Sequence, residues 1–186
     1  ITKEKFIRTF REKQITLFSG QDIFKLFSLK PSSAKALLGR LKEGEIIKPL
    51  TRGKYLFLLA ATPPEEFEIA NFIYAPSYVS LESALSFYGI IEQFPYQISS
   101  ITLKKTKLLK IGEKTFTYSR IKPEFFIDYQ REKNFLIAGP KKAIFDFLYF
   151  AYKGTRTKNN LRLLRPERIN LKKSALKEYL LAGKAL

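Results

Sequence analysis

The chain has 186 residues, with 34 Lys/Arg against 17 Asp/Glu, and it contains neither Cys nor His. These two absences exclude disulfides, cysteine nucleophiles, the Ser-His-Asp triad and almost all zinc sites. There is no run of 18 apolar residues and no leader of the signal-peptide kind, so we expect a cytoplasmic protein without a membrane span. The net charge of +17 favours a polyanionic partner, above all nucleic acid.

The positive charge is concentrated at the two ends of the chain. Residues 1–60 hold 13 Lys/Arg against 5 Asp/Glu, and residues 153–186 hold 10 against 2, so each end has a net charge of +8. Residues 61–152 hold 11 against 10, a net charge of +1. Charge that served only solubility would be spread evenly. We therefore expect the polyanion contacts at the ends.

The first part of the chain predicts two helices separated by a short strand. Thr2 is a suitable N-cap for a helix over 2–14, whose apolar residues share one face. A β-prone run follows at 15–18. Ser19 and Asp22 then have the S-x-x-D spacing of a capping box, which opens the second helix.

A third helix and a β-hairpin complete this region. Ser32 or Ser33 is expected to cap the helix, where Ala34 begins an apolar series at i, i+3, i+4 and i+7 and Gly44 ends it. Two strands joined by a basic turn are expected at 46–50 and 55–59. Three helices followed by a hairpin are the order of a winged helix-turn-helix, which binds double-stranded DNA.

This assignment predicts which residues contact DNA. Small residues on the outward face of the third helix let it enter the major groove, and basic residues beside them reach phosphates or a guanine edge. The residues expected nearest the bases are Ser32, Ser33, Ala36 and Arg40. The residues expected on the DNA backbone are Lys35, Lys42, Arg52 and Lys54.

The rest of the chain predicts a second domain. Two prolines place the boundary after residue 62, so the DNA-binding domain is 1–62 and a mixed α/β domain is 63–186, with a basic helical tail at 153–186. The expected helices are 65–74, 80–88 and 141–152, and the expected strands are 98–103, 114–118 with its continuation to 121, and 135–138. The predicted fold class is α+β.

We find no enzyme signature, and we expect no catalytic residue, metal or cofactor. The segment 139–142 lacks the spacing of a phosphate-binding loop, and the carboxylates of the middle region lack the spacing of a nuclease metal site. Asp146 lies in an otherwise apolar helix, where we expect it to make a buried polar contact.

The tail is a second basic element. Its cations are Arg156, Lys158, Arg162, Arg165, Arg168, Lys172 and Lys173. The sequence of the tail fits three kinds of partner: a further stretch of the bound DNA, an acidic protein, or RNA.

Three segments resemble the AbiEi family, the antitoxins of type IV toxin–antitoxin systems. Residues 77–89, SYVSLESALSFYG, resemble the family's YVSLESAL…G signature. Residues 101–106 resemble its next segment, and residues 135–146 resemble its ATPEKALLD-like segment, with Gly139 and Lys141 in place of the usual Thr and Glu. The resemblance covers about residues 2–152.

The resemblance implies an N-terminal winged helix, a C-terminal α/β antitoxin domain and repression of the protein's own operon through inverted repeats in its promoter. It also implies that the protein counters a nucleotidyltransferase-like toxin without forming a stable complex with it. The residues themselves leave other readings open: a stand-alone winged-helix regulator, a protein-interaction adaptor without antitoxin activity, or an RNA-binding regulator.

Overall fold

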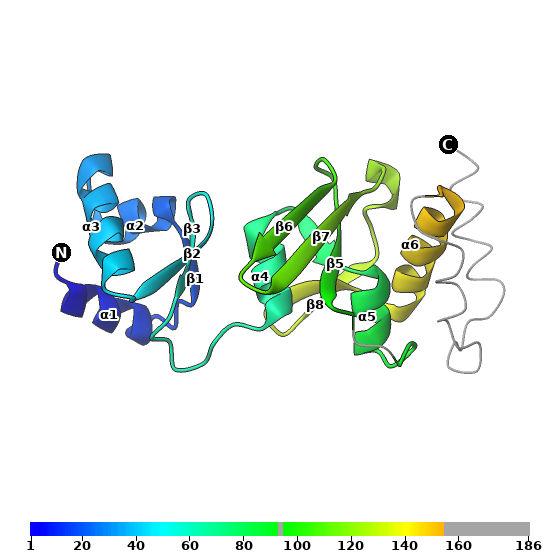
Figure 1. The fold of residues 1–186 in the computed structure, drawn as a ribbon, viewed down its shortest axis with the longest axis horizontal. Helices are drawn as coiled ribbons and strands as arrows, with labels where there is room; N and C mark the ends of the chain where they lie inside the picture. The colour runs from blue at the N-terminus through cyan, green and yellow to red at the C-terminus, as the bar shows by residue number, and fades with distance from the viewer. Residues whose placement is uncertain (93–94, 155–186) are drawn as a thin grey trace. The chain divides into compact units, whose positions relative to one another are not determined.

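The computed structural model describes residues 1–92 and 95–154. The chain divides into two compact units, residues 1–73 and residues 74–186 (Figure 1). Over the described residues it is a mixed α+β protein with six α-helices and two sheets, which confirms the predicted fold class. None of these helices is both long and apolar enough to cross a membrane. The predicted helical tail beyond residue 154 lies outside the described residues.

The first unit contains four helices and a small antiparallel sheet. Its elements are α1 (Lys3–Glu12), β1 (Leu17–Ser19), α2 (Gly20–Phe27), α3 (Pro31–Glu43), β2 (Ile47–Thr51), β3 (Lys54–Phe57) and α4 (Glu66–Ile73). The strand order is β1-β3-β2, so the strand between α1 and α2 extends the hairpin that follows α3.

Two of the three predicted helix starts are confirmed. The Thr2 side chain accepts a hydrogen bond from the Lys5 amide, and Ser19 and Asp22 form the reciprocal capping box. The third start is wrong, because α3 begins at Pro31 rather than after a serine cap. Proline suits the first helical position, where its fixed φ is helical and its missing N–H leaves no donor unsatisfied.

Aromatic rings from three elements form the core of the first unit. Phe6 and Phe10 of α1 stack at 4.0 Å, and Phe10 contacts Phe18 of β1 at 4.9 Å and Phe57 of β3 at 5.4 Å between ring centroids. All four side chains are at most 1% exposed. Because α1 and the sheet are joined through these rings, the core fixes the frame against which α3 packs.

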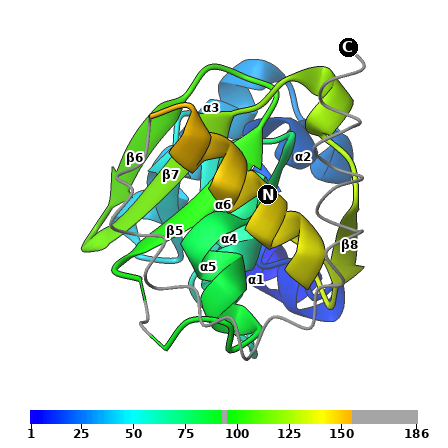
Figure 2. The same cartoon turned by 90° about the vertical axis from the view of Figure 1, so that its right-hand side faces the viewer.

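The second unit is a six-stranded mixed sheet with two helices. Its elements are β4 (Ser77–Val79), α5 (Leu81–Phe87), β5 (Gln97–Thr102), β6 (Lys107–Ile111), β7 (Lys114–Arg120), a 3-10 turn (Pro123–Phe125), β8 (Tyr129–Glu132), β9 (Phe135–Ala138) and α6 (Pro140–Tyr152). The strand order is β6-β7-β5-β4-β9-β8. Helices α5 and α6 contact each other and cover one face of the sheet (Figure 2).

Candidate nucleic-acid interface

The outward face of α3 is built from small side chains. A helix turns about 100° per residue, so the buried Ala34, Leu37, Leu38 and Leu41 occupy one side. The opposite side presents Ser32, Ala36, Gly39 and Glu43. Three of these four residues have no more than two heavy side-chain atoms, so the helix backbone is accessible from outside along most of its length.

Basic side chains flank this face on both sides. Lys35 and Lys42 lie on one shoulder of α3, and Arg40 lies on the other with Ser33; all four residues are exposed. Within residues 1–92 and 95–154, none of the three cations has an ion-pair partner. Their charge is therefore not neutralised within the described fold and is available to phosphate groups outside it.

Arg52 and Lys54, the two cations predicted to contact DNA from the turn between β2 and β3, lie in different environments. Arg52 is exposed next to Gly53, whose φ of +74° suits a residue without a side chain. Lys54 is half-buried, its ammonium donates to the Phe72 carbonyl, and it lies 5.1 Å from the Phe72 ring centroid. Contact of Lys54 with DNA stays a prediction, and it requires this ammonium to leave Phe72.

The Lys54 contact has a local cause. Phe72 lies in the last turn of α4, where backbone carbonyls have no N–H partner within the helix. No basic residue of α4 itself lies in that turn. A lysine from the hairpin therefore supplies the positive charge that stabilises the C-terminal end of a helix.

Several cations of α1 are used inside the first unit. Arg8 pairs with Glu12 at 3.9 Å, and Arg11 donates to the Leu59 carbonyl at 3.1 Å. The Lys3 ammonium lies beside Gly44, 3.0 Å from the place a Cβ would take, and so stands at the C-terminal end of α3. The basic residues of α3 and Arg52 are therefore stronger candidates than those of α1 for binding phosphate groups of a partner.

Sequence reasoning missed a further basic segment, in the second unit. Residues 104–122 hold seven Lys/Arg against one acidic residue, Glu113, but averaging over 61–152 hides this excess. The segment includes β6, an edge strand, and Lys104 and Lys107 lie 5.5 and 5.2 Å from the Tyr74 ring centroid. Lysines on an edge strand also prevent pairing with other sheets, so the charge alone assigns no partner. A count over a window of about twenty residues would have found it.

Four polar side chains meet in a buried cluster inside the second unit. Ser80 Oγ and Tyr78 OH donate to Asp146 Oδ2 at 2.7 and 3.1 Å, and the Lys142 ammonium donates to Asp146 Oδ1. Lys142 is 1% exposed and the other three are fully buried. The prediction that Asp146 makes a buried polar contact is confirmed. The cluster joins residues 77–89 to residues 135–146, two of the segments that carry the family resemblance.

The cluster links α6 to β4 and to the start of α5. Burial raises the pKa of the Asp146 carboxyl, while Lys142, Ser80 and Tyr78 oppose that shift by charge and hydrogen bonding. The Ser80 hydroxyl donates to Asp146, and Ser80 does not cap α5 with its side chain. The next residue, Leu81, has a φ of +59° and is fully buried, so a strained backbone position lies directly beside the cluster.

Two buried tyrosines give a testable pH dependence. Burial, and secondly the Asp146 carboxylate, raise the pKa of the Tyr78 hydroxyl far above 10, and burial does the same for Tyr118. Both stay neutral in the folded protein but ionise in the unfolded chain above about pH 10. Their stabilising effect is thus present below pH 10 and lost as the pH rises.

Absorbance at 295 nm should show at least two of the ten tyrosines resisting ionisation until circular dichroism reports unfolding. Ionisation of all ten while the far-UV spectrum stays native would contradict this.

Comparison with models of known protein families and with curated protein sequences gives no match for the chain. The predicted contacts from Arg156 to Lys173 lie outside the described residues. The predicted α3 and hairpin residues therefore carry the functional argument.

Proposed function

We propose that the first unit contains a winged helix-turn-helix that binds double-stranded DNA, with α3 in the major groove and Arg52 on the backbone. In this proposal α2 and α3 are the helix-turn-helix, and β2 and β3 are the wing. We further propose that the protein is an autorepressor and antitoxin of the AbiEi kind, binding inverted repeats in its own promoter. One such domain covers one half-site, so inverted repeats require two copies.

The outward face of α3 is the observation that carries the DNA-binding proposal. An α-helix fits the major groove, which is about 12 Å wide, when its outward side chains are small enough to let it approach. Ser32, Ala36 and Gly39 meet that condition, and Lys35 and Arg40 stand at the two sides of the same face. The main competing explanation, a solvated surface helix, accounts for Ala36 by helix propensity but not for Gly39, which costs about 1 kcal/mol relative to alanine.

Salt dependence of the affinity tests the DNA contact. If Lys35, Lys42 and Arg52 each neutralise one phosphate, the slope of log K against log salt for one half-site is about −2.7, which is roughly a fortyfold loss between 50 and 200 mM salt. Fluorescence anisotropy on a duplex from the upstream promoter measures this slope. An unrelated duplex of equal length and a structured RNA serve as competitors. An affinity that does not change with salt, or a preference for the RNA, would refute the proposal.

Single substitutions separate base contacts from backbone contacts. Arg40→Ala or Lys35→Ala should cost about 1–3 kcal/mol if the side chain makes a bidentate contact with a guanine. The loss should then be larger on the promoter duplex than on the unrelated duplex. Lys13→Ala, at an exposed lysine directly after α1 and outside the proposed interface, is the control. An equal loss on both duplexes would assign the residue to the backbone, and a loss of a few tenths would remove it from the interface.

Support for the antitoxin part comes from the second unit. The two resembling segments, residues 77–89 and 135–146, bond to each other through Asp146, so they serve one structural element. Co-expression with a nucleotidyltransferase-like toxin encoded next to this chain tests the activity, with recovery of growth as the expected result. Normal repression without recovery of growth would leave a stand-alone regulator and would refute the antitoxin proposal.

A further inference from the structure

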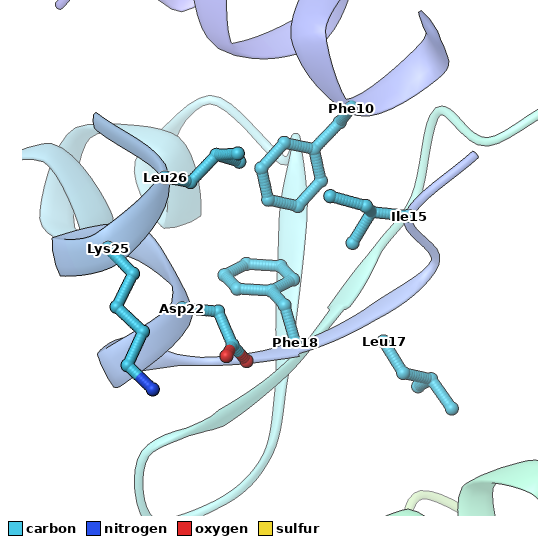
Figure 3. Close-up of a pocket in the computed structure, with 7 residues that line it drawn as sticks. All are labelled: Phe10, Ile15, Leu17, Phe18, Asp22, Lys25 and Leu26. Carbon is cyan, nitrogen blue, oxygen red and sulfur yellow. The ribbon is translucent and has the colours of Figure 1, made fainter. Parts of the chain in front are cut away.

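The hollow of the first unit, between α1, β1 and α2, has a lining that selects no class of ligand (Figure 3). Its rings, Phe10 and Phe18, are each 1% exposed, and its charged residues, Asp22 and Lys25, have opposite signs. Strand β6, at the edge of the sheet in the second unit, differs on both points (Figure 1). Its exposed side chains carry one sign of charge and include an apolar residue, so they favour a partner of definite chemistry.

Strand β6 presents peptide groups on its outer side that no described residue pairs with. It stands first in the strand order, and among the described strands it pairs with β7 alone. A two-residue turn joins β6 to β7, with a φ of +61° at Gly112, so Ile111 and Lys114 are the hydrogen-bonded pair that closes the hairpin. Bonded and non-bonded positions alternate along an antiparallel pair. The N–H and C=O groups of Leu108 and Lys110 therefore point away from β7, where a further strand could bond to them.

The side chains of β6 begin in the order basic, apolar, apolar, basic. Lys107, Leu108 and Lys110 are exposed, Leu108 by 57%, and Leu109 is half-buried. The segment 104–122, which includes β6, holds seven basic residues and one acidic residue, and the neighbouring β7 holds no acidic residue. No described side chain forms an ion pair with Lys107 or Lys110. Negative charge in a partner is therefore favoured at both ends of this run of four residues.

We propose that β6 binds an extended acidic peptide as an additional strand, with two apolar residues of the peptide between two acidic ones. The peptide backbone bonds to Leu108 and Lys110, and its apolar side chains lie against Leu108 and Leu109. Its carboxylates lie opposite Lys107 and Lys110. A phosphodiester backbone would use only the lysines and leave the exposed leucine and the peptide groups unused. A second copy of β6 would add lysines to a segment that is already basic, and edge lysines oppose such pairing. The proposal does not depend on DNA binding by the first unit.

A matched set of hexapeptides tests the proposal on the full chain. The peptide TEVVET has the proposed pattern, TEPPET keeps its charge but lacks the two central N–H groups, and TKVVKT reverses its charge. The measurement is amide hydrogen exchange with water, followed by NMR. At millimolar concentration TEVVET is expected to slow exchange at Leu108 and Lys110 by about twofold or more, which corresponds to half occupancy. The amides of Leu109 and Ile111, already bonded to β7, should not change. TEPPET and TKVVKT should protect neither of the outward amides.

Charge reversal on β6 makes the result decisive. The double variant Lys107→Glu/Lys110→Glu should weaken TEVVET about tenfold or more and bind TKVVKT instead, because opposite charges across strands stabilise and like charges destabilise. Lys110→Glu alone serves the same purpose if the double variant lacks native amide dispersion. Lys141→Glu, at an exposed lysine of α6, is the control and should leave the binding of TEVVET unchanged. No protection of Leu108 and Lys110 by TEVVET, equal protection by TEPPET, or no effect of the charge reversal would each overturn the proposal. Displacement of TEVVET by an equal concentration of duplex DNA would assign the segment to nucleic acid and overturn it as well.

Discussion

Replacing Asp146 by alanine is expected to lower the free energy of unfolding of the second unit by about 3–5 kcal/mol, the range for removing one partner of a buried ion pair. The loss of stability arises from the buried groups that Asp146→Ala leaves without a partner. The Lys142 ammonium, 1% exposed, would be left without its counter-charge, and the hydroxyls of Tyr78 and Ser80 would lose their acceptor. All of these groups are at most 1% exposed, so water is a poor substitute.

Urea denaturation followed by far-UV circular dichroism measures this loss. The matched control is Lys141→Ala, because Lys141 is exposed and precedes the buried Lys142 on the same helix; it should change stability by less than about 0.5 kcal/mol. The double substitution Lys142→Met/Asp146→Leu should recover part of the loss, since an apolar pair of similar volume removes the uncompensated charge. A loss below 1 kcal/mol for Asp146→Ala, or a double variant as unstable as the worse single one, would contradict the account.

Local patterns in the sequence predicted most of the helices, because their starting signals act over three or four residues. Thr2 and Ser19 cap α1 and α2 as expected, and Gly44 follows the last residue of α3. The strand at 135–138 has the predicted bounds, since four apolar residues before Gly-Pro leave few alternatives. These cases share one property: the partners that decide the structure are close in the sequence.

The parts that could not be predicted depend on distant partners. Ser80 has the sequence signature of a helix cap, yet its hydroxyl bonds a carboxylate 66 residues away. Lys54 was expected on DNA, and its ammonium bonds a carbonyl 18 residues away. Lys141 and Lys142 are adjacent, and only the packing of α6 exposes the first and buries the second. Strand β8, with the sequence YQRE, has no apolar alternation to show that it pairs with β9.

Gly39, in the outward face of α3, provides the most direct test of the DNA-binding proposal. Glycine inside a helix costs about 1 kcal/mol relative to alanine. A Cβ added at Gly39 would meet nothing within 4 Å, so packing inside the described fold does not explain the missing side chain. If α3 lies in the major groove, close approach of DNA explains it. Gly39→Ala should therefore raise the free energy of unfolding by about 0.5–1 kcal/mol.

Gly39→Leu separates folding from binding more sharply. Leucine is a good helix former, so this variant should also be at least as stable as the original chain. Its side chain stands in the middle of the outward face, between Ala36 and Glu43, and should hold α3 away from the base edges. Loss of the base contacts predicts at least about a hundredfold weaker binding to the promoter duplex, at roughly 1–3 kcal/mol for each contact.

Two measurements on the same samples decide the matter. Thermal unfolding reports stability, and fluorescence anisotropy reports affinity for the promoter duplex. Thr62→Leu, which places the same leucine side chain at an exposed position between β3 and α4, is the control and should bind normally. Normal binding by Gly39→Leu would place the DNA contact elsewhere on the chain, even if the salt dependence holds. A stable variant that no longer binds DNA would show that the missing side chain serves the partner and not the fold.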